Sequence, residues 1–245
     1  MIVISPAPSR EMSALQHRYG PDTMPLVRLP NGKLLYFAHV PKCAGTAVEH
    51  YLKSRFGALG LLDPGFGRRT PFEAWSLSPP QHMPELLRRE LLPDTLFDGI
   101  FATIRHPAVR LRSIFLFQQK VENAVPATLR FDRWIDILPR ALALDPYAMH
   151  GHLQPMIRYV PESAHVFRIE DGLDALVAWL DGHAEETDGP RRIATANVTA
   201  ERLRDTPPTI PPLTAPICAR IADLYQADYD RFGYDMLPDM QEGTP

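Results

Sequence analysis

The chain has 245 residues, of which 45% are apolar, so it is long enough to bury a hydrophobic core of its own. Its net charge of −3 argues against the broad basic surface of a nucleic-acid-binding protein. Two cysteines cannot build a disulfide framework, and no segment approaches the roughly 20 apolar residues of a membrane span. The first residues lack the basic segment of a signal peptide. We therefore expect a single cytoplasmic domain over residues 1–245, with no nucleic-acid partner and no membrane span.

The first predicted elements are a strand over residues 34–40 and an amphipathic helix over 46–56, after a variable lead-in at 1–32. The joint between them, residues 41–47, reads Pro-Lys-Cys-Ala-Gly-Thr-Ala. A strand-to-helix joint aims backbone N–H groups and the positive end of a helix dipole at one point. The sequence therefore predicts an anion-binding loop here.

Three residue types within this loop strengthen the prediction. Lys42 adds a full positive charge, Thr46 adds a hydroxyl, and Gly45 lets the backbone come close to a ligand. The order differs from a Walker A loop, in which the lysine directly follows the last glycine and precedes a magnesium-binding Ser or Thr. This order disfavours a nucleotide-dependent kinase, which is the first alternative function.

A second joint of the same kind follows the predicted strand at 99–104. Arg105 leaves the carboxyl end of this strand, where ligands bind in open α/β sheets, and a helix is predicted over 108–120. Ser113 lies about two helical turns further on and can reach back toward the same cleft. The guanidinium fork of arginine matches phosphate oxygens. The alternative is that Arg105 caps a neighbouring helix and that Ser113 is incidental.

The two joints, taken in their order along the chain, resemble the 5′-phosphosulfate loop and the 3′-phosphate site of certain sulfotransferases. These enzymes use 3′-phosphoadenosine 5′-phosphosulfate (PAPS). The resemblance is to the carbohydrate and membrane-associated families, and it extends over about residues 34–235. Weaker parts of it are an acidic pair at 170–171, the segment around Asn197 and a Phe-Gly-Tyr stop at 232–234. The resemblance implies a P-loop-like three-layer α/β/α sandwich with a central parallel sheet.

The implied reaction moves a sulfuryl group from PAPS to a hydroxyl or amine of a carbohydrate or glycolipid acceptor. Adenosine 3′,5′-bisphosphate is the second product, and no metal is implied because protein cations compensate the charge. Lys42 would steady the leaving phosphate oxygen. The donor-binding residues implied by the resemblance are Pro41, Lys42, Cys43, Ala44, Gly45, Thr46, Ala47, Arg105, Ser113 and Asn197. A second alternative is a protein of the same fold that binds the nucleotide without transfer.

The acceptor proton requires a base with a pKa near neutrality. His82, which lies ahead of the second strand as in many relatives, is the first candidate, and Glu170 is the second. The alternatives are a surface or helix-capping role for His82 and, for Glu170, a cap on the helix that begins near Leu173. His39 lies on a buried strand and is expected to pack beneath the loop.

The predicted strands alternate with predicted helices along the chain. The strands lie at 34–40, 99–104 and 164–169, and the last helix lies at 172–181. This alternation argues for a parallel sheet covered on both faces. The long segments at 57–97 and 123–163 are expected to determine acceptor specificity.

The sequence also predicts the surroundings of three further residues. Arg110 and Arg112 are expected on a solvated helix face. A lowered thiol pKa is expected for Cys43 in the anion loop, although direct transfer needs no cysteine nucleophile.

Overall fold

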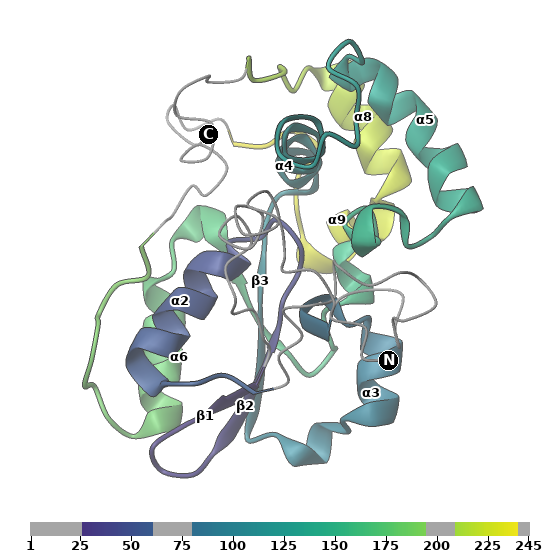
Figure 1. The fold of residues 1–245 in the computed structure, drawn as a ribbon. Coiled ribbons are helices and arrows are strands. Elements are labelled where there is room, and N and C mark those ends of the chain that lie inside the picture. Colours follow the sequence, from purple (N-terminus) through teal and green to yellow (C-terminus); the bar gives the residue numbers. More distant parts are fainter. Residues whose placement is uncertain (1–25, 61–79, 195–208, 240–245) are drawn as a thin grey trace, which may run out of the picture.

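The computed structural model describes residues 26–60, 80–194 and 209–239. They form an α/β structure around a four-stranded sheet of order β1-β2-β3-β4 (Figure 1). The strands are β1 (Leu26–Arg28), β2 (Leu34–Ala38), β3 (Gly99–Ile104) and β4 (His165–Arg168). Strands β2, β3 and β4 run parallel, as predicted, whereas β1 pairs antiparallel with β2. The expectation of a wholly parallel sheet was therefore wrong, because the end of the presumed lead-in folds back on β2 as a hairpin.

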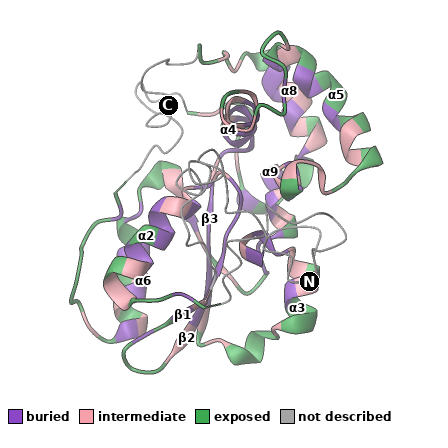
Figure 2. Cartoon of the chain, viewed as in Figure 1, coloured by how far each residue is buried: buried purple, intermediate pink, exposed green. Residues whose placement is uncertain are grey.

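Both faces of the sheet are buried (Figure 2). Successive side chains of a strand point to opposite faces. Leu35, Phe37 and Phe101 accordingly pack into one core, while Tyr36 and Ala102 pack into another. This explains why β2 and β3 read as continuous apolar runs.

Helices α2 (Gly45–Phe56) and α6 (Asp174–Ala184) cover one face of the sheet (Figure 1). The opposite face is covered by α3 (Glu85–Leu91), the short helix η5 (Met156–Arg158) and α9 (Gln226–Phe232). The chain is therefore layered on both sides of the sheet, as the alternation of strands and helices predicted.

A group of helices lies beyond the carboxyl ends of the strands. It contains α4 (Pro107–Lys120), α5 (Phe131–Leu144) and α8 (Ala215–Leu224), which share a core with α9 (Figure 1). The α4 helix contacts both α5 and α8, and residues on nearly every side of it are buried. This position makes α4 the link between the sheet and the helical group.

The remaining elements are single 3-10 turns: η2 (Pro80–His82), η3 (Asp94–Leu96), η4 (Ala148–Gly151) and η6 (Ile169–Asp171). The predicted C-terminal stop is confirmed, because α9 ends at Phe232 and Gly233 follows in the left-handed conformation with φ 61°. Within the described residues, no helix is long and apolar enough to cross a membrane.

Candidate functional site

The loop between β2 and α2 has an unusual backbone. Lys42 and Ala44 both adopt left-handed φ angles, of 65° and 61°, although neither is glycine. Such a conformation costs about 1–2 kcal/mol per residue and is concentrated at functional sites. The N–H groups of Ala47 and Val48 both donate to the carbonyl of Ala44. The amides of Gly45 and Thr46 thus precede the helical hydrogen-bond ladder, in the position that helices use for anions.

Gly45 is required by the residue beneath it. A Cβ atom at this position would lie 1.6 Å from Nε2 of His39. The expectation that His39 packs under the loop is therefore confirmed. Gly45 was expected to allow close approach of a ligand, but the ring of His39 is a nearer steric reason for a glycine here.

His39 also forms a buried pair with a carboxyl group of α2, since its Nδ1 lies 2.8 Å from Oε1 of Glu49. Burial and the charge of Lys42 lower the pKa of His39 to about 3, and burial raises the pKa of Glu49 to about 9. At neutral pH the pair therefore retains one ionisable proton and carries no net charge.

The two predicted anion-binding joints lie side by side. Ala38 pairs with Ala102, so β2 and β3 end at the same edge of the sheet. The hydroxyl of Thr103 then donates to the carbonyl of Cys43 over 2.6 Å, which ties the first loop to the strand of the second joint. Sequence reasoning missed this role of Thr103, a buried polar residue near the end of β3.

Arg110 ties the loop to α4. It is completely buried, and its Nε donates to the carbonyl of Pro41 over 3.0 Å. The expectation of a solvated face was wrong because α4 is enclosed by other elements, and a long side chain on its buried side reaches the loop. Its other guanidinium contacts go to the carbonyls of His152 and Gln154, both at 2.9 Å.

Cys43 is a packing residue. Its side chain is completely buried, and its Sγ lies 3.9 Å from Sδ of Met156. Burial raises the pKa of the thiol to about 12, although the nearby charges of Arg110 and Arg105 act in the opposite direction. The expected lowering of its pKa was therefore wrong, since loss of hydration outweighs the local positive charge.

The ammonium group of Lys42 points toward α4. Its Nζ lies 4.1 Å from the centroid of the Phe117 ring, a cation–π contact. Its charge also lowers the pKa of His39 and of His152, so all three groups lie close together. Lys42 is thus held between the loop and the helical group.

His82 belongs to a histidine cluster with His39 and His152. Its ring is buried, and its centroid lies 4.6 Å from that of His39 and 5.4 Å from that of His152. Its Nδ1 lies 3.1 Å from the carbonyl oxygen of His39. A carbonyl only accepts, so Nδ1 carries the proton and Nε2 keeps a lone pair. The alternative of a surface histidine was wrong.

Burial is also the main reason why the pKa of His82 lies well below its usual range, and the neighbouring His39 acts in the same direction. The side chain is therefore neutral at physiological pH, as a base must be before it accepts a proton, but its pKa does not lie near neutrality as the sequence argument required.

His152 was missed as a candidate. Its Nδ1 is buried without a hydrogen-bond partner among the described residues. The pKa of His152 is lowered mainly by burial, and the charges of its neighbours act in the same direction. It follows a strained turn in which Met149, His150 and Gly151 all have positive φ angles. The His-Gly-His sequence was the available signal, but only the fold brings the second histidine to Lys42.

Residues 151–157, the segment that carries His152, are anchored by hydrogen bonds from side chains of the C-terminal helices. The hydroxyl of Tyr225 donates to the carbonyl of Leu153 over 2.6 Å. The buried carboxylate of Asp228 accepts from the amides of Met156 and Ile157, at 2.8 and 2.9 Å. Together with Arg110, these bonds fix the backbone beside the histidine cluster.

Glu170 stands at the second joint. Its Oε1 accepts from the amide of His106 over 2.7 Å, and its Oε2 accepts from the hydroxyl of Tyr234 over 3.2 Å. The anticipated capping interaction therefore involves the start of α4 rather than the helix after Glu170, because the fold brings β4 next to β3. Glu170 also acts electrostatically on Arg105, whose pKa is lowered mainly by burial.

Two further residues to report lie on α4, after this joint. Ser113 is half-buried, and Arg112 is only 7% exposed, so the expectation of a solvated Arg112 was wrong for the same reason as for Arg110. Asn197, the remaining predicted donor contact, lies outside the described residues.

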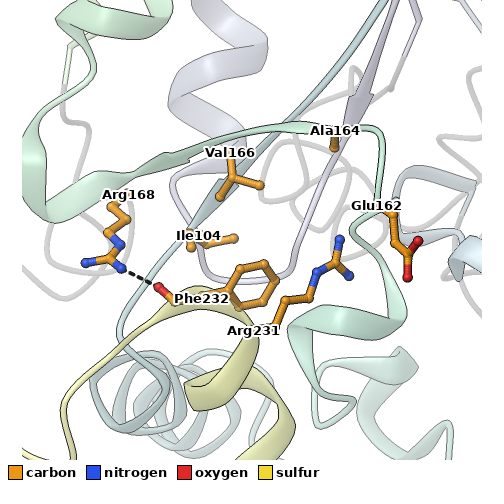
Figure 3. A pocket seen from close by; sticks show the side chains of 7 residues that line it. All are labelled: Ile104, Glu162, Ala164, Val166, Arg168, Arg231 and Phe232. Atoms are coloured by element: carbon orange, nitrogen blue, oxygen red, sulfur yellow. Dashed lines mark hydrogen bonds between the residues drawn. The ribbon is translucent and has the colours of Figure 1, made fainter.

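A pocket of about 300 Å³ lies between β4 and α9 (Figure 3). Its apolar lining includes Ile104, Val166 and Phe232. Its two arginines are engaged by the backbone: Arg168 donates to the carbonyls of Phe232 and Gly233, and Arg231 to those of Val160 and Pro161. One nitrogen of Arg168 and two of Arg231 are thus engaged by the backbone, and none of the described lining residues comes from the loop at 41–47.

Comparisons with models of protein families, with curated protein sequences and with solved structures gave no match. The case for a function therefore depends on the geometry of the two joints.

Proposed function

We propose that the protein is a PAPS-dependent sulfotransferase. The observation that carries this proposal is the Thr103–Cys43 hydrogen bond, which joins the two predicted anion-binding motifs at one edge of the sheet. One joint supplies Lys42 and first-turn amides, and the other supplies Arg105. A nucleotide with a phosphosulfate at one end and a phosphate at the other has anionic groups for both.

The residues present fit such a donor. Residues 41–47 form a strained loop at a helix start, which suits the 5′-phosphosulfate. Arg105 and Ser113 are assigned to the 3′-phosphate, with Asn197 as the predicted contact beyond the described residues. The ammonium of Lys42, close to Phe117, is assigned to the negative charge that develops on the leaving oxygen.

His82 is assigned as the base. In the proposed step, Nε2 of His82 takes the proton of an acceptor hydroxyl or amine, and the acceptor atom forms a bond to sulfur. The bond between sulfur and the bridging oxygen breaks, and its electron pair stays on the phosphate of adenosine 3′,5′-bisphosphate, beside Lys42. His82 is the stronger candidate because it has a lone pair, whereas both carboxylate oxygens of Glu170 already accept hydrogen bonds at the other joint.

The acceptor is proposed to be a carbohydrate or glycolipid, on the resemblance alone. Segments 57–97 and 123–163 flank the histidine cluster, because His82 and His152 come from them. They are therefore the regions in which acceptor specificity is expected.

The first experiment is calorimetric titration without metal, using adenosine 3′,5′-bisphosphate, 5′-AMP and Mg-ATP. We expect tight binding of the bisphosphate, loss of most of that binding without the 3′-phosphate, and a similar loss in Arg105→Ala. Equal or tighter binding of Mg-ATP would refute the proposal and favour a kinase. If the bisphosphate binds but no acceptor is sulfated with PAPS, a nucleotide-binding protein without transfer activity is the better description.

A further inference from the structure

The fold gives no reason for a buried carboxyl group on α2. Glu49 is 0% exposed, and its Oε1 lies 2.8 Å from Nδ1 of His39. This contact is not aligned as a ring N–H hydrogen bond, and no other described group bonds to either oxygen of Glu49. Burying a carboxyl group with so few partners is costly, and an apolar side chain would suit the core between α2 and the sheet. The pair of Glu49 and His39 therefore requires another explanation.

The contact between the two side chains indicates where their protons lie. Burial raises the pKa of Glu49 to about 9, and burial together with the charge of Lys42 lowers the pKa of His39 to about 3. At neutral pH, Glu49 is thus a carboxylic acid and His39 is neutral. Among the described residues, Nδ1 of His39 is the acceptor at hydrogen-bond distance from the acid, whose hydroxyl can turn toward it. The one proton of the imidazole is then on Nε2.

The imidazole of His39 spans one turn of α2. Gly45 and Glu49 are four residues apart, so they lie on the same face of the helix, with Gly45 at its start. While Nδ1 faces Glu49, Nε2 is the ring atom closest to where a Cβ of Gly45 would lie, at 1.6 Å, ahead of Cδ2 and Cε1 at 2.2 and 2.3 Å. The Cα–Cβ bonds of a helix tilt toward its N-terminus. Nε2 therefore points to the end of α2 where the amides of Gly45 and Thr46 precede the helical hydrogen-bond ladder.

We infer that His39 is a side-chain hydrogen-bond donor of the loop at 41–47, and that Glu49 is the positioning residue that orients its ring. Gly45 has no side chain, so a bound oxyanion can approach Nε2–H of His39 as well as the amides of Gly45 and Thr46. A hydrogen bond from an N–H group to a charged oxygen is among the stronger ones in proteins. This role rests on the anion-binding part of the proposed function. It adds two residues to that site, of which His39 was expected only to pack.

The test keeps the core and varies only the donor at position 39. Both proteins carry Glu49→Met, which fills the space of the carboxyl group, together with either His39→Gln or His39→Met. The two replacements at position 39 have the same length, but only the amide of glutamine has N–H donors. Affinity for sodium sulfate is measured from the rise of the thermal midpoint, relative to sodium chloride of equal ionic strength. We expect His39→Gln/Glu49→Met to bind sulfate about as well as the wild type, and His39→Met/Glu49→Met to bind it about 10- to 100-fold more weakly. Equal affinities of the two variants would overturn the role of His39.

Stability without sulfate separates this role from a structural one. His39→Met/Glu49→Met should be at least as thermally stable as the wild type, because replacing a buried polar pair by apolar side chains is often neutral or stabilising. A clear loss of stability, or failure to fold, would show that the pair is needed for folding and would count against a role in anion binding.

The wild type provides a measurement that does not depend on the folding of a variant. Nitrogen NMR spectra of protein labelled at its histidines distinguish the two tautomers of the His39 ring. We expect a proton on Nε2, and on titration with sodium sulfate the Nε2 signal should move more than the Nδ1 signal. A proton on Nδ1, or an Nε2 signal that does not respond to bound sulfate, would overturn the role of His39.

These outcomes differ from those that test the proposed function. If sulfate binds through the donor at position 39 but adenosine 3′,5′-bisphosphate does not bind, the role of His39 stands and the sulfotransferase proposal fails. If the bisphosphate binds and the sulfate affinity does not depend on that donor, the nucleotide assignment stands and the role of His39 is refuted. If sulfate does not stabilise the wild type beyond sodium chloride, the role of His39 is refuted as well.

Discussion

Gly45 is the position in the loop where a single methyl group should do the most damage. In Gly45→Ala, the new Cβ would lie 1.6 Å from Nε2 of His39, which must move away from Glu49. We expect a loss of about 1–3 kcal/mol in the free energy of unfolding, measured in urea. The matched control is Gly182→Ala in α6, where a Cβ meets nothing within 4 Å. It should gain about 0.5–1 kcal/mol, and equal effects of both changes would contradict this account.

The buried pair of His39 and Glu49 should make stability depend on pH. Native Glu49 keeps its proton up to about pH 9, whereas the unfolded chain loses it near 4.5, so native protein binds more protons in between. Stability from Glu49 therefore falls as pH rises through this range. His39, with a native pKa of about 3 and an unfolded value of 6.5, acts in the opposite direction below pH 6.5. The two contributions oppose each other up to pH 6.5. Above pH 6.5, only the loss of stability from Glu49 remains.

We thus expect the urea midpoint of the wild type to fall between pH 6.5 and 9. Glu49→Gln, which resembles the protonated acid, should flatten this part of the profile. A slope that persists unchanged in the variant would assign it to other groups.

The short helix η2 and the segment 151–157 each contribute one histidine to the cluster, so their roles can be separated. His82→Ala should reduce kcat by about 10²–10⁴-fold, as loss of a general base does, and leave binding of the bisphosphate unchanged. Because burial keeps the pKa of His82 well below its usual value of 6.5, the wild-type rate should not fall as the pH is lowered through 6.5. Turnover is measured with labelled PAPS once an acceptor has been found.

His152→Ala is the companion variant, because His152 lies beside both His82 and Lys42. We expect a smaller loss of kcat in His152→Ala than in His82→Ala. If His152→Ala removes turnover while His82→Ala retains it, the base is His152, and the assignment made here from the Nδ1 contact of His82 is wrong.

The proposed donor should link the sheet to the helical group. The first joint belongs to the sheet and α2, and the second leads into the helical group through α4. A ligand that spans both should slow amide hydrogen exchange at residues 42–48 and 105–113 together. Mass spectrometry with adenosine 3′,5′-bisphosphate measures this, and 5′-AMP is the control that should protect mainly the first range. Protection confined to one joint by the bisphosphate would contradict the shared site.

Local sequence patterns predicted the three parallel strands and the helices α2, α4 and α6, but not α5. Strand β3 and the start of α4 at Pro107 were predictable because apolar β-branched runs and proline at the first helical turn are local signals. Strand β1 was missed because three residues carry too little periodicity, and its pairing with β2 is decided by the hairpin.

The chain order by itself determined that two strand-to-helix joints carry Lys42 and Arg105, and that both would lie at the carboxyl edge of a parallel sheet. It determined this because strand polarity and helix dipoles follow from local conformation. Only the tertiary structure decided that Arg110 and Arg112 are buried, that Cys43 has a raised pKa, and that His152 joins His82. Burial and charge compensation depend on which elements surround a side chain, and residues more than 40 positions apart supply those surroundings.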